Sequence, residues 1–390
     1  MNDMQDFTIE NGVLVKYMGT ASHAVIPDNV TVIGEKALAN CNPLQTVAMP
    51  SSVVRIEREA FSNCESLTYI EFSENLESIG DCALRWCDSL QKAVLPESLK
   101  TLGKWSFDGC SSLTSVHLSK GITEIPDWAF NECSALASIE TPENVRKIGE
   151  GAFGGCESLT HIDFPKNLEI IEELAFEDCV ALKQVTFPSL VQKIGYRAFA
   201  GCCSLVCVEF QGQMLDFLNS TFQECVSLKT VKLPEGLIEI LAVFRDCDAL
   251  EEVILPQSVS IIGARLFDGC TSLRQVQLPE NVTVIEEMAF ENCTNLEEIK
   301  IPDGVEIIED ETFYGCSSLK EIILPESVRK IGDTAFTDCV GLKNIQIPSS
   351  VEEIGEDAFD GCENLTIHAP AGSYAEQYAR ENNLAFCPKN

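Results

Sequence analysis

A cysteine recurs every 23 residues through almost all of this 390-residue chain, and only the step from Cys225 to Cys247 is shorter, at 22 residues. Leucine stands three residues after each of these fifteen cysteines, and phenylalanine stands three residues before all but two of them. A fixed period of this length is typical of a solenoid, in which each layer stacks only on its neighbours. We therefore expect one elongated domain of about fifteen repeats, although length alone would favour roughly two or three globular domains. The cysteines of this column are Cys41, Cys64, Cys87, Cys110, Cys133, Cys156, Cys179, Cys202, Cys225, Cys247, Cys270, Cys293, Cys316, Cys339 and Cys362.

Each layer carries the same apolar pattern, counted from its cysteine as position 0. In the layer of Cys316, Leu319, Ile322 and Leu324 occupy positions +3, +6 and +8. Because alternate side chains of a strand point to opposite faces, +6 and +8 should point inward and +5 and +7 outward. Proline at +9 ends the strand in eleven of fourteen layers, since proline cannot continue a central ladder. An Ala-Phe pair at −4 and −3 suits one tight helical turn, because a full helix needs about ten residues. The pattern predicts a mainly-β fold of stacked short parallel strands joined by turns and 3₁₀-like segments.

The first 25 residues form a lead-in that differs from the repeats. Asn11-Gly12 lies between two alternating apolar runs within residues 7–17. Asn-Gly supplies the positive φ angles of a type I′ turn, so this stretch predicts a β-hairpin. An open end of a solenoid needs a cover, and we interpret residues 1–25 as the N-terminal hairpin cap.

The last residues also depart from the repeat. After a solenoid over residues 26–370, Ser373 and Glu376 form a capping box ahead of good helix formers. Residues 384–386 follow as a possible edge strand. We predict that residues 371–390 form a C-terminal helical cap.

The chain holds 19 cysteines, and fifteen of them fall in the one column. Parallel side chains in register give poor dihedral geometry for disulfides, and an odd number cannot pair completely. The spacing shows no zinc-site pattern, and Cys202, Cys203 and Cys207 are only loosely clustered. We therefore predict a buried column of thiols that act as small hydrophobic groups and weak donors, with no metal and no cofactor. Such thiols suit a reducing compartment or an anaerobic habitat.

The charge balance is strongly acidic, with 61 acidic against 27 basic residues and a net charge of −34. A chain of this charge should be soluble and monomeric, and nucleic acids and anionic membranes should repel it. No apolar run is long enough to insert into a bilayer. The N-terminal residues lack the basic region and apolar core of a signal peptide. The sequence leaves the compartment open. The protein is either cytoplasmic, or it is a secreted or cell-surface protein whose leader is not part of this sequence.

The columns together read Cys-x-x-Leu-x-x-Ile-x-Leu-Pro-x-x-Val-x-x-Ile-Gly-x-x-Ala-Phe. This pattern resembles the BspA-type leucine-rich repeat, a bacterial class with a 23-residue period, over about residues 26–386. The resemblance implies a leucine-rich-repeat solenoid with a terminal helix. It also implies a protein of the kind that is often exposed at the cell surface and adheres to host proteins or other microbes.

Catalytic signatures are absent from the sequence. The four histidines lie in different layers, and there is no phosphate-binding glycine-rich loop and no nucleophile elbow. We therefore expect no enzyme activity and no catalytic residues. The acid excess lies chiefly in the turns at −6 and −5 and is most simply a solvated surface.

The outward strand positions +4, +5 and +7 are close to neutral, with eight basic and nine acidic residues. Their C-terminal half is dense in alternating charge and their N-terminal half is milder. Interface cores are depleted of charge and enriched in aromatic residues. We therefore predict that Tyr69, His117 and His161 bind a partner.

The predicted function is a non-enzymatic interaction or adhesion module that presents an elongated repeat surface to a protein or glycan. A bacterial cell-surface protein and an intracellular scaffold are both compatible with it. A solenoid carbohydrate-active enzyme is the alternative from another class, and three or more carboxylates converging in neighbouring layers of one face would favour it. A structural spacer that binds nothing is a further alternative.

One stretch, residues 203–247, breaks the pattern. It loses a proline and a glycine of the repeat and then one whole residue, which we expect the segment from −7 to −4 to absorb. The sequence leaves open whether this is a tolerated irregularity or a functional notch.

Overall fold

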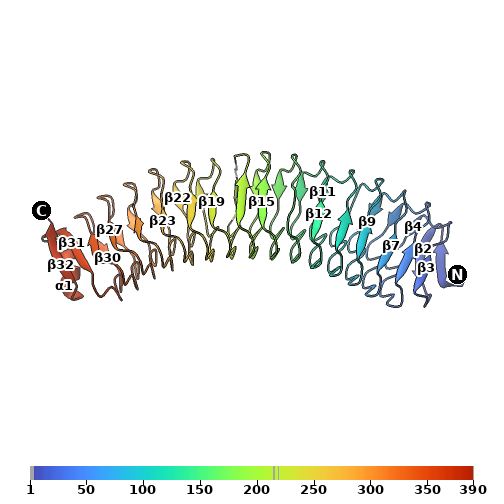
Figure 1. The fold of residues 1–390 in the computed structure, drawn as a ribbon, viewed down its shortest axis with the longest axis horizontal. Coiled ribbons are helices and arrows are strands. Elements are labelled where there is room, and N and C mark those ends of the chain that lie inside the picture. Colours follow the sequence, from blue (N-terminus) through green and yellow to red (C-terminus); the bar gives the residue numbers. More distant parts are fainter. Residues whose placement is uncertain (1–3, 214–215, 218, 390) are drawn as a thin grey trace. The chain divides into compact units, whose positions relative to one another are not determined.

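A computed structural model describes residues 4–213, 216–217 and 219–389 and shows a mainly-β parallel solenoid (Figure 1). The predicted fold class is therefore confirmed. The chain divides into two compact units, Met1–Cys203 and Ser204–Asn390. A typical layer contains a leading strand at about +5 to +7, a second strand at about −9 and −8, and a run of turns from −7 to −1 that we name the turn flank. In the layer of Cys110 the second strand, and in the layer of Cys156 the leading strand, is reduced to an isolated bridge. No helix in the described ranges is long and apolar enough to cross a membrane.

Unit 1 begins with the predicted hairpin. After the short 3₁₀ helix η1 (Met4–Asp6), β1 (Phe7–Glu10) pairs antiparallel with β2 (Val13–Tyr17). Asn11 and Gly12 take φ angles of 50° and 81°, as the turn requires. On its other side β2 pairs in parallel with the second strand of the first layer, so the hairpin continues directly into the stack.

The leading strands of unit 1 form a six-stranded parallel sheet in the order β12-β10-β9-β7-β5-β3. Their +6 side chains are buried and their +5 and +7 side chains are mostly exposed, as the alternation predicts. The strands are β3 (His23–Val25), β5 (Thr46–Ala48), β7 (Tyr69–Glu71), β9 (Lys92–Val94), β10 (Ser115–His117) and β12 (Ser138–Glu140), with β15 (Gln184–Phe187) in a later layer.

The second strands of unit 1 are only two residues long. One run follows β2 in the order β4-β6-β8, and another runs in the order β11-β13-β14-β16. They are β4 (Val32–Ile33), β6 (Arg55–Ile56), β8 (Ser78–Ile79), β11 (Glu124–Ile125), β13 (Lys147–Ile148), β14 (Ile170–Ile171) and β16 (Lys193–Ile194).

The leading strands of unit 2 fall into three groups, because their pairing is interrupted twice. The groups run in the orders β17-β19-β21, β23-β25 and β27-β29-β31-β32. They are β17 (Cys207–Phe210), β19 (Thr230–Lys232), β21 (Glu252–Ile254), β23 (Gln275–Val276), β25 (Glu298–Ile299), β27 (Glu321–Ile323), β29 (Asn344–Gln346), β31 (Thr366–Pro370) and β32 (Ala385–Lys389).

The second strands of unit 2 form the runs β20-β22-β24 and β26-β28-β30. They are β18 (Asp216–Phe217), β20 (Glu239–Ile240), β22 (Ile261–Ile262), β24 (Val284–Ile285), β26 (Ile307–Ile308), β28 (Lys330–Ile331) and β30 (Glu353–Ile354).

The C-terminal end carries helix α1 (Tyr374–Glu381), as the capping box predicts. Ser373 accepts a hydrogen bond from the Glu376 N–H at 3.4 Å, and the Glu376 carboxylate accepts one from the Gly372 N–H at 2.6 Å. Strand β32 then pairs in parallel with β31 and forms the sheet edge that the sequence predicts.

The core of each unit is a stack of equivalent side chains. In unit 1, the rings of Phe107, Phe130, Phe153, Phe176 and Phe199 stack one on the next with centroids 5.0–5.6 Å apart. All are fully buried. The period therefore places each phenylalanine on its own equivalents, which fixes the register of the layers.

The cysteine column is buried beside these rings, as predicted. The thiols do more than fill space, because in the column from Cys64 to Cys202 and from Cys247 to Cys362 each Sγ donates to the backbone carbonyl at position −3 of the preceding layer. Cys133 reaches the Phe107 carbonyl at 3.2 Å, and Cys316 reaches that of Phe290 at 3.2 Å. A buried donor is thus satisfied in layer after layer.

The turn flank is held by hydrogen bonds between layers and not by a helix. Phe61 N–H donates to the Ala83 carbonyl and Asn63 N–H to the Arg85 carbonyl, both at 2.8 Å. Positions −5 and −1 have positive φ in every described layer, for example 59° at Asn63. Position −1 is Gly, Asn or Asp in twelve of the fifteen layers, because these residues accept this conformation most easily.

The shortened layer before Cys247 absorbs its missing residue where the sequence predicts. In a regular layer two residues separate the second strand from position −5, as Gly80 and Asp81 do. Between β20 and Ala242, which has a φ of 51°, only Leu241 remains. Three residues of the preceding irregular layer, Met214, Leu215 and Leu218, lie outside the described residues.

Candidate functional site

The three residues predicted to bind a partner all lie on the outward face of unit 1. Tyr69 is in β7 with half of its side chain exposed, and His117 is in β10. His161 is exposed at the equivalent of Tyr69, four layers along. Tyr69 pairs with Lys92 and Lys92 with Ser115, so about 10 Å, two strand spacings, separates Tyr69 from the layer of His117. The structure brings the three to one face and not to one pocket.

The histidines of this face have local partners. His117 Nε2 lies 3.5 Å from Glu97 Oε1, and both side chains are more than half exposed. The backbone N–H of Lys120, with a smaller contribution from His117, lowers the pKa of Glu97. His161 Nδ1 lies 3.2 Å from the Thr160 hydroxyl. Within the described residues no three His, Cys, Asp or Glu side chains are grouped to hold a metal.

The outward face of unit 2 is hollowed, and we name the hollow over β21, β23, β25 and β27 the unit 2 groove. Its volume is about 640 Å³. It lies where the pairing of the leading strands is interrupted. Two side-chain columns line it, with Ile254, Gln277, Lys300 and Ile323 at +7 and Glu252, Gln275, Glu298 and Glu321 at +5.

The groove has apolar ends and a polar middle. Ile254 and Ile323 are exposed by 49% and 55%, although isoleucine is usually buried. Between them stand Gln277 and Lys300, and the ammonium group of Lys300 lies 3.0 Å from Glu280 Oε1. Polar groups around exposed apolar side chains are the usual composition of a protein interface.

A second hollow of about 640 Å³ borders the groove at positions +4 and +5, from Arg274 to Asn344. Its lining holds charges of both signs, and the Lys320 ammonium contacts the Glu297 carboxylate. That contact lowers the pKa of Glu297. This second hollow is therefore bordered by a row of exposed charges of both signs. The charges were evident in the sequence, but the hollow beside them was not predicted.

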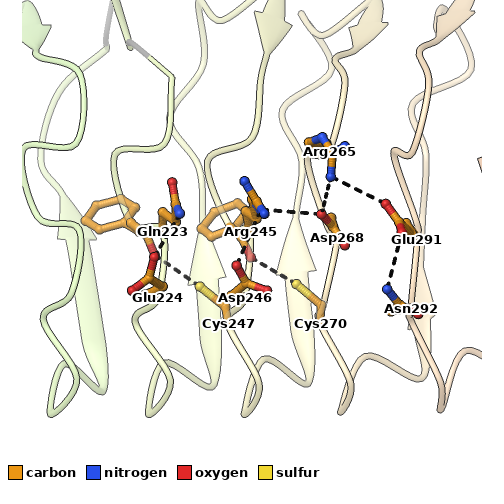
Figure 2. Close-up of polar contacts among 12 residues, drawn as sticks. Gln223, Glu224, Arg245, Asp246, Cys247, Arg265, Asp268, Cys270, Glu291 and Asn292 are labelled. Carbon is orange, nitrogen blue, oxygen red and sulfur yellow. Dashed lines mark hydrogen bonds and ion pairs between the residues drawn. The ribbon is translucent and has the colours of Figure 1, made fainter.

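The turn flank of unit 2 holds a ladder of charged side chains (Figure 2). Arg265 lies 3.0 Å from Asp268 and 3.5 Å from Glu291, and Arg245 Nε lies 3.4 Å from Asp268. Burial and the Asp268 charge raise the pKa of Glu291. Asp268 and Glu291 each have a guanidinium neighbour, and these ion pairs tie three layers together. Nε of Arg245 is buried and makes no hydrogen bond with the described residues.

The thiols beside this ladder are poor nucleophiles. Cys247 and Cys270 donate to the carbonyls of Phe222 and Phe244, both at 3.1 Å (Figure 2). Burial raises the pKa of both thiols far above the usual range. Since the thiolate is the reactive form, the column has a structural role.

Comparisons with known proteins agree with the repeat. The family model described as "BspA type Leucine rich repeat region" matches residues 14–137, 54–172, 146–243 and 241–366. A leucine-rich repeat protein from Bacteroides ovatus is 30% identical, with 98% of this chain and 97% of that chain covered and a TM-score of 0.77.

Two further solved structures are similar in sequence. A leucine rich cell surface protein from Faecalibacterium prausnitzii is 26% identical, with 97% and 94% covered and a TM-score of 0.48. A leucine-rich repeat protein from T. pallidum is 29% identical, with 52% and 90% covered and a TM-score of 0.43. No curated protein matches the chain.

Proposed function

The chain belongs to the BspA-type leucine-rich-repeat family, and from this premise we propose that it is a non-enzymatic interaction protein whose unit 2 groove binds a protein partner. The observation that carries the proposal is the pair of exposed isoleucines, Ile254 and Ile323, at the two ends of a groove with polar walls. A few side chains supply most of the binding energy of a protein interface, and we expect the two isoleucines to be among them once a partner covers them.

Site-specific photocrosslinking in cells that make the protein tests the groove. A photoreactive residue replaces Ile254 or Ile323 in one pair of variants. The matched control replaces Ile238, which is exposed by 58% but lies outside the groove. The groove positions should give a discrete protein adduct that the control does not. Adducts of equal yield from all three positions, or none from the groove, contradict the proposal.

Tyr69, His117 and His161 stay a second proposed contact area on the outward face of unit 1. Their separation means that a partner must lie across several layers to touch all three, as an extended segment or a flat surface does. Alanine at the three positions together should weaken binding of the crosslinked partner if that partner extends onto unit 1. Unchanged binding would remove this area from the proposal.

Family membership favours display at the cell surface over an intracellular scaffold. Proteolysis of intact producing cells distinguishes the two, because peptides of a displayed protein are released before lysis. Complete protection until lysis would favour the scaffold.

A carbohydrate-active enzyme is the second candidate, since Glu252, Glu298 and Glu321 line one groove. All three side chains are exposed to water, whereas a catalytic acid usually lies in enclosed or apolar surroundings. We therefore expect no turnover of oligosaccharides. If the protein cleaves an oligosaccharide and Glu298→Gln abolishes that cleavage, an enzymatic function would replace the proposed interaction function.

A further inference from the structure

All three tryptophans of the protein gather on the turn flank of three consecutive layers of unit 1. Trp86 is at position −1 of the layer of Cys87, and Trp105 and Trp128 are at position −5 of the next two layers. Trp86 is exposed by 43%, and the other two are half-buried. Backbone hydrogen bonds join the three layers here, from Trp86 to Asp108 at 2.7 Å and from Trp105 to Asp127 at 3.1 Å.

The tryptophans occupy positions that disfavour them. Their φ angles are 57°, 53° and 57°, a region in which a bulky side chain is an outlier. Trp86 stands in a column where twelve of fifteen layers have Gly, Asn or Asp. Burial in the core does not explain them, because these columns face outward. The repeat imposes the conformation in every layer, so what needs an explanation is the choice of a bulky indole at three exposed or half-buried positions.

Glycines of the following layers support two of the rings. A Cβ on Gly109 would lie 2.3 Å from Trp86 Cδ1, and one on Gly151 would lie 2.3 Å from Trp128 Cε3. The rings therefore lean over glycines, and each needs that space. Trp86 also contacts the Arg85 guanidinium, which lies 4.0 Å from the ring centroid. These contacts hold the rings of Trp86 and Trp128 in place.

The side chains that share this surface are polar. Asp108 accepts hydrogen bonds from Arg85 Nε at 2.7 Å and from Asn131 Nδ2 at 2.8 Å. The ammonium group of Lys104 lies 2.6 Å from Asp127. Apart from the tryptophans, the outward positions −6, −5, −2 and −1 of these layers hold charged or amide side chains, one cysteine and one glycine, and no aliphatic residue.

We propose that this tryptophan surface binds an uncharged glycan, at a site separate from the unit 2 groove. The faces of indole rings are electron-rich and receive the C–H groups of one side of a pyranose ring. The guanidinium, carboxylate and amide groups beside them can pair with sugar hydroxyls. Both cations are already paired with carboxylates, and the protein is acidic overall, so a glycan that carries carboxylates or sulfates is repelled.

An array of neutral oligosaccharides (β-glucans, mannans, galactans and chitin fragments) tests the proposal, with sialylated and sulfated glycans as the charged comparison. The full-length protein should bind a neutral class and ignore the charged ones. Because no other tryptophan is present, intrinsic fluorescence reports this surface alone. The selected glycan should shift the emission and protect it from acrylamide.

Single Trp→Gly variants identify the site, because glycine accepts positive φ and keeps the backbone in place. Each should weaken binding about tenfold or more. Tyr196→Ala is the matched control, since Tyr196 is exposed by 42% on the turn flank of the same unit and lies outside the cluster. Circular dichroism verifies that each variant is folded.

Three outcomes would overturn the proposal. The first is a protein that binds no neutral glycan on the array. The second is binding that the Trp→Gly variants retain in full. The third is capture of a protein partner that the same variants lose, which would make the surface a protein interface.

Discussion

High pH should unfold unit 2 steeply, because its buried thiols cannot ionise in the folded state. Burial raises the pKa of the Cys362 thiol to about 12 and that of the five column thiols before it further still. The ordinary value, which we take for the unfolded chain, is 9.0. Those five are Cys247, Cys270, Cys293, Cys316 and Cys339.

The sign follows from proton binding. Below pH 9.0 both states hold the proton and the stability is fully present. As the pH rises from 9.0 towards about 12, the unfolded chain loses protons that the folded chain keeps, so the free energy of unfolding falls. Each thiol removes about 1.4 kcal/mol per pH unit in this window, and six layers that unfold together lose about 8 kcal/mol per pH unit.

The measurement follows ultraviolet absorbance of the thiolate and circular dichroism in one alkaline titration, after the accessible thiols have been alkylated at neutral pH. The two signals should change together, well above pH 9.0. Cys316→Ala should make the transition less steep, because one titrating group is removed. Thiolate absorbance that rises near pH 9.0 while circular dichroism stays constant would refute the reasoning.

Three further predictions concern stability measured by chemical denaturation. Ser106 is fully buried and its hydroxyl has no hydrogen-bond partner, so Ser106→Ala should raise the free energy of unfolding by about 1 kcal/mol. Thr312 occupies the same position −4 and donates to the Glu309 carbonyl at 2.7 Å; Thr312→Ala should therefore not stabilise, and equal gains for both would contradict the argument. Phe290→Ala should cost about 3–5 kcal/mol because its ring is stacked on both sides, whereas Phe290→Leu should cost less than half of that, since two natural layers carry leucine there. Gly332→Ala should lower the free energy of unfolding by about 1–3 kcal/mol, because its Cβ would lie 2.6 Å from a backbone nitrogen of the preceding layer. An unchanged denaturation midpoint would contradict this, because it would mean that the two layers can move apart without loss of stability.

Much of the fold could be predicted because every layer repeats one set of contacts. A residue in a regular solenoid packs on its own equivalents, so a column of Phe or Cys in the sequence becomes a column in space. The hairpin at Asn11-Gly12, the capping box at Ser373 and the layer shortened beside Leu241 were predicted for local reasons, and each is present.

The candidate sites could be predicted only in part. Strand alternation is enough to place Tyr69, His117 and His161 on one outward face. The unit 2 groove could not be predicted, because no residue pattern shows where the pairing of the leading strands is interrupted. The feature of the sequence that could have indicated the groove is the isoleucine at two outward +7 positions, Ile254 and Ile323.

The layer, its length, its inward and outward positions and its thiol column follow from the sequence alone, since these depend on contacts between equivalent residues at a constant period. Which residues at different positions of neighbouring layers meet is visible only in the folded molecule. Arg265 at position −5 lies 3.5 Å from Glu291 at position −2 of the next layer, and the Cys316 thiol lies beside the Phe290 carbonyl, at position −3 of the layer before. The physical reason is that stacking offsets one layer against the next, and the positive φ angles of the turn flank turn side chains in directions that no period in the sequence records.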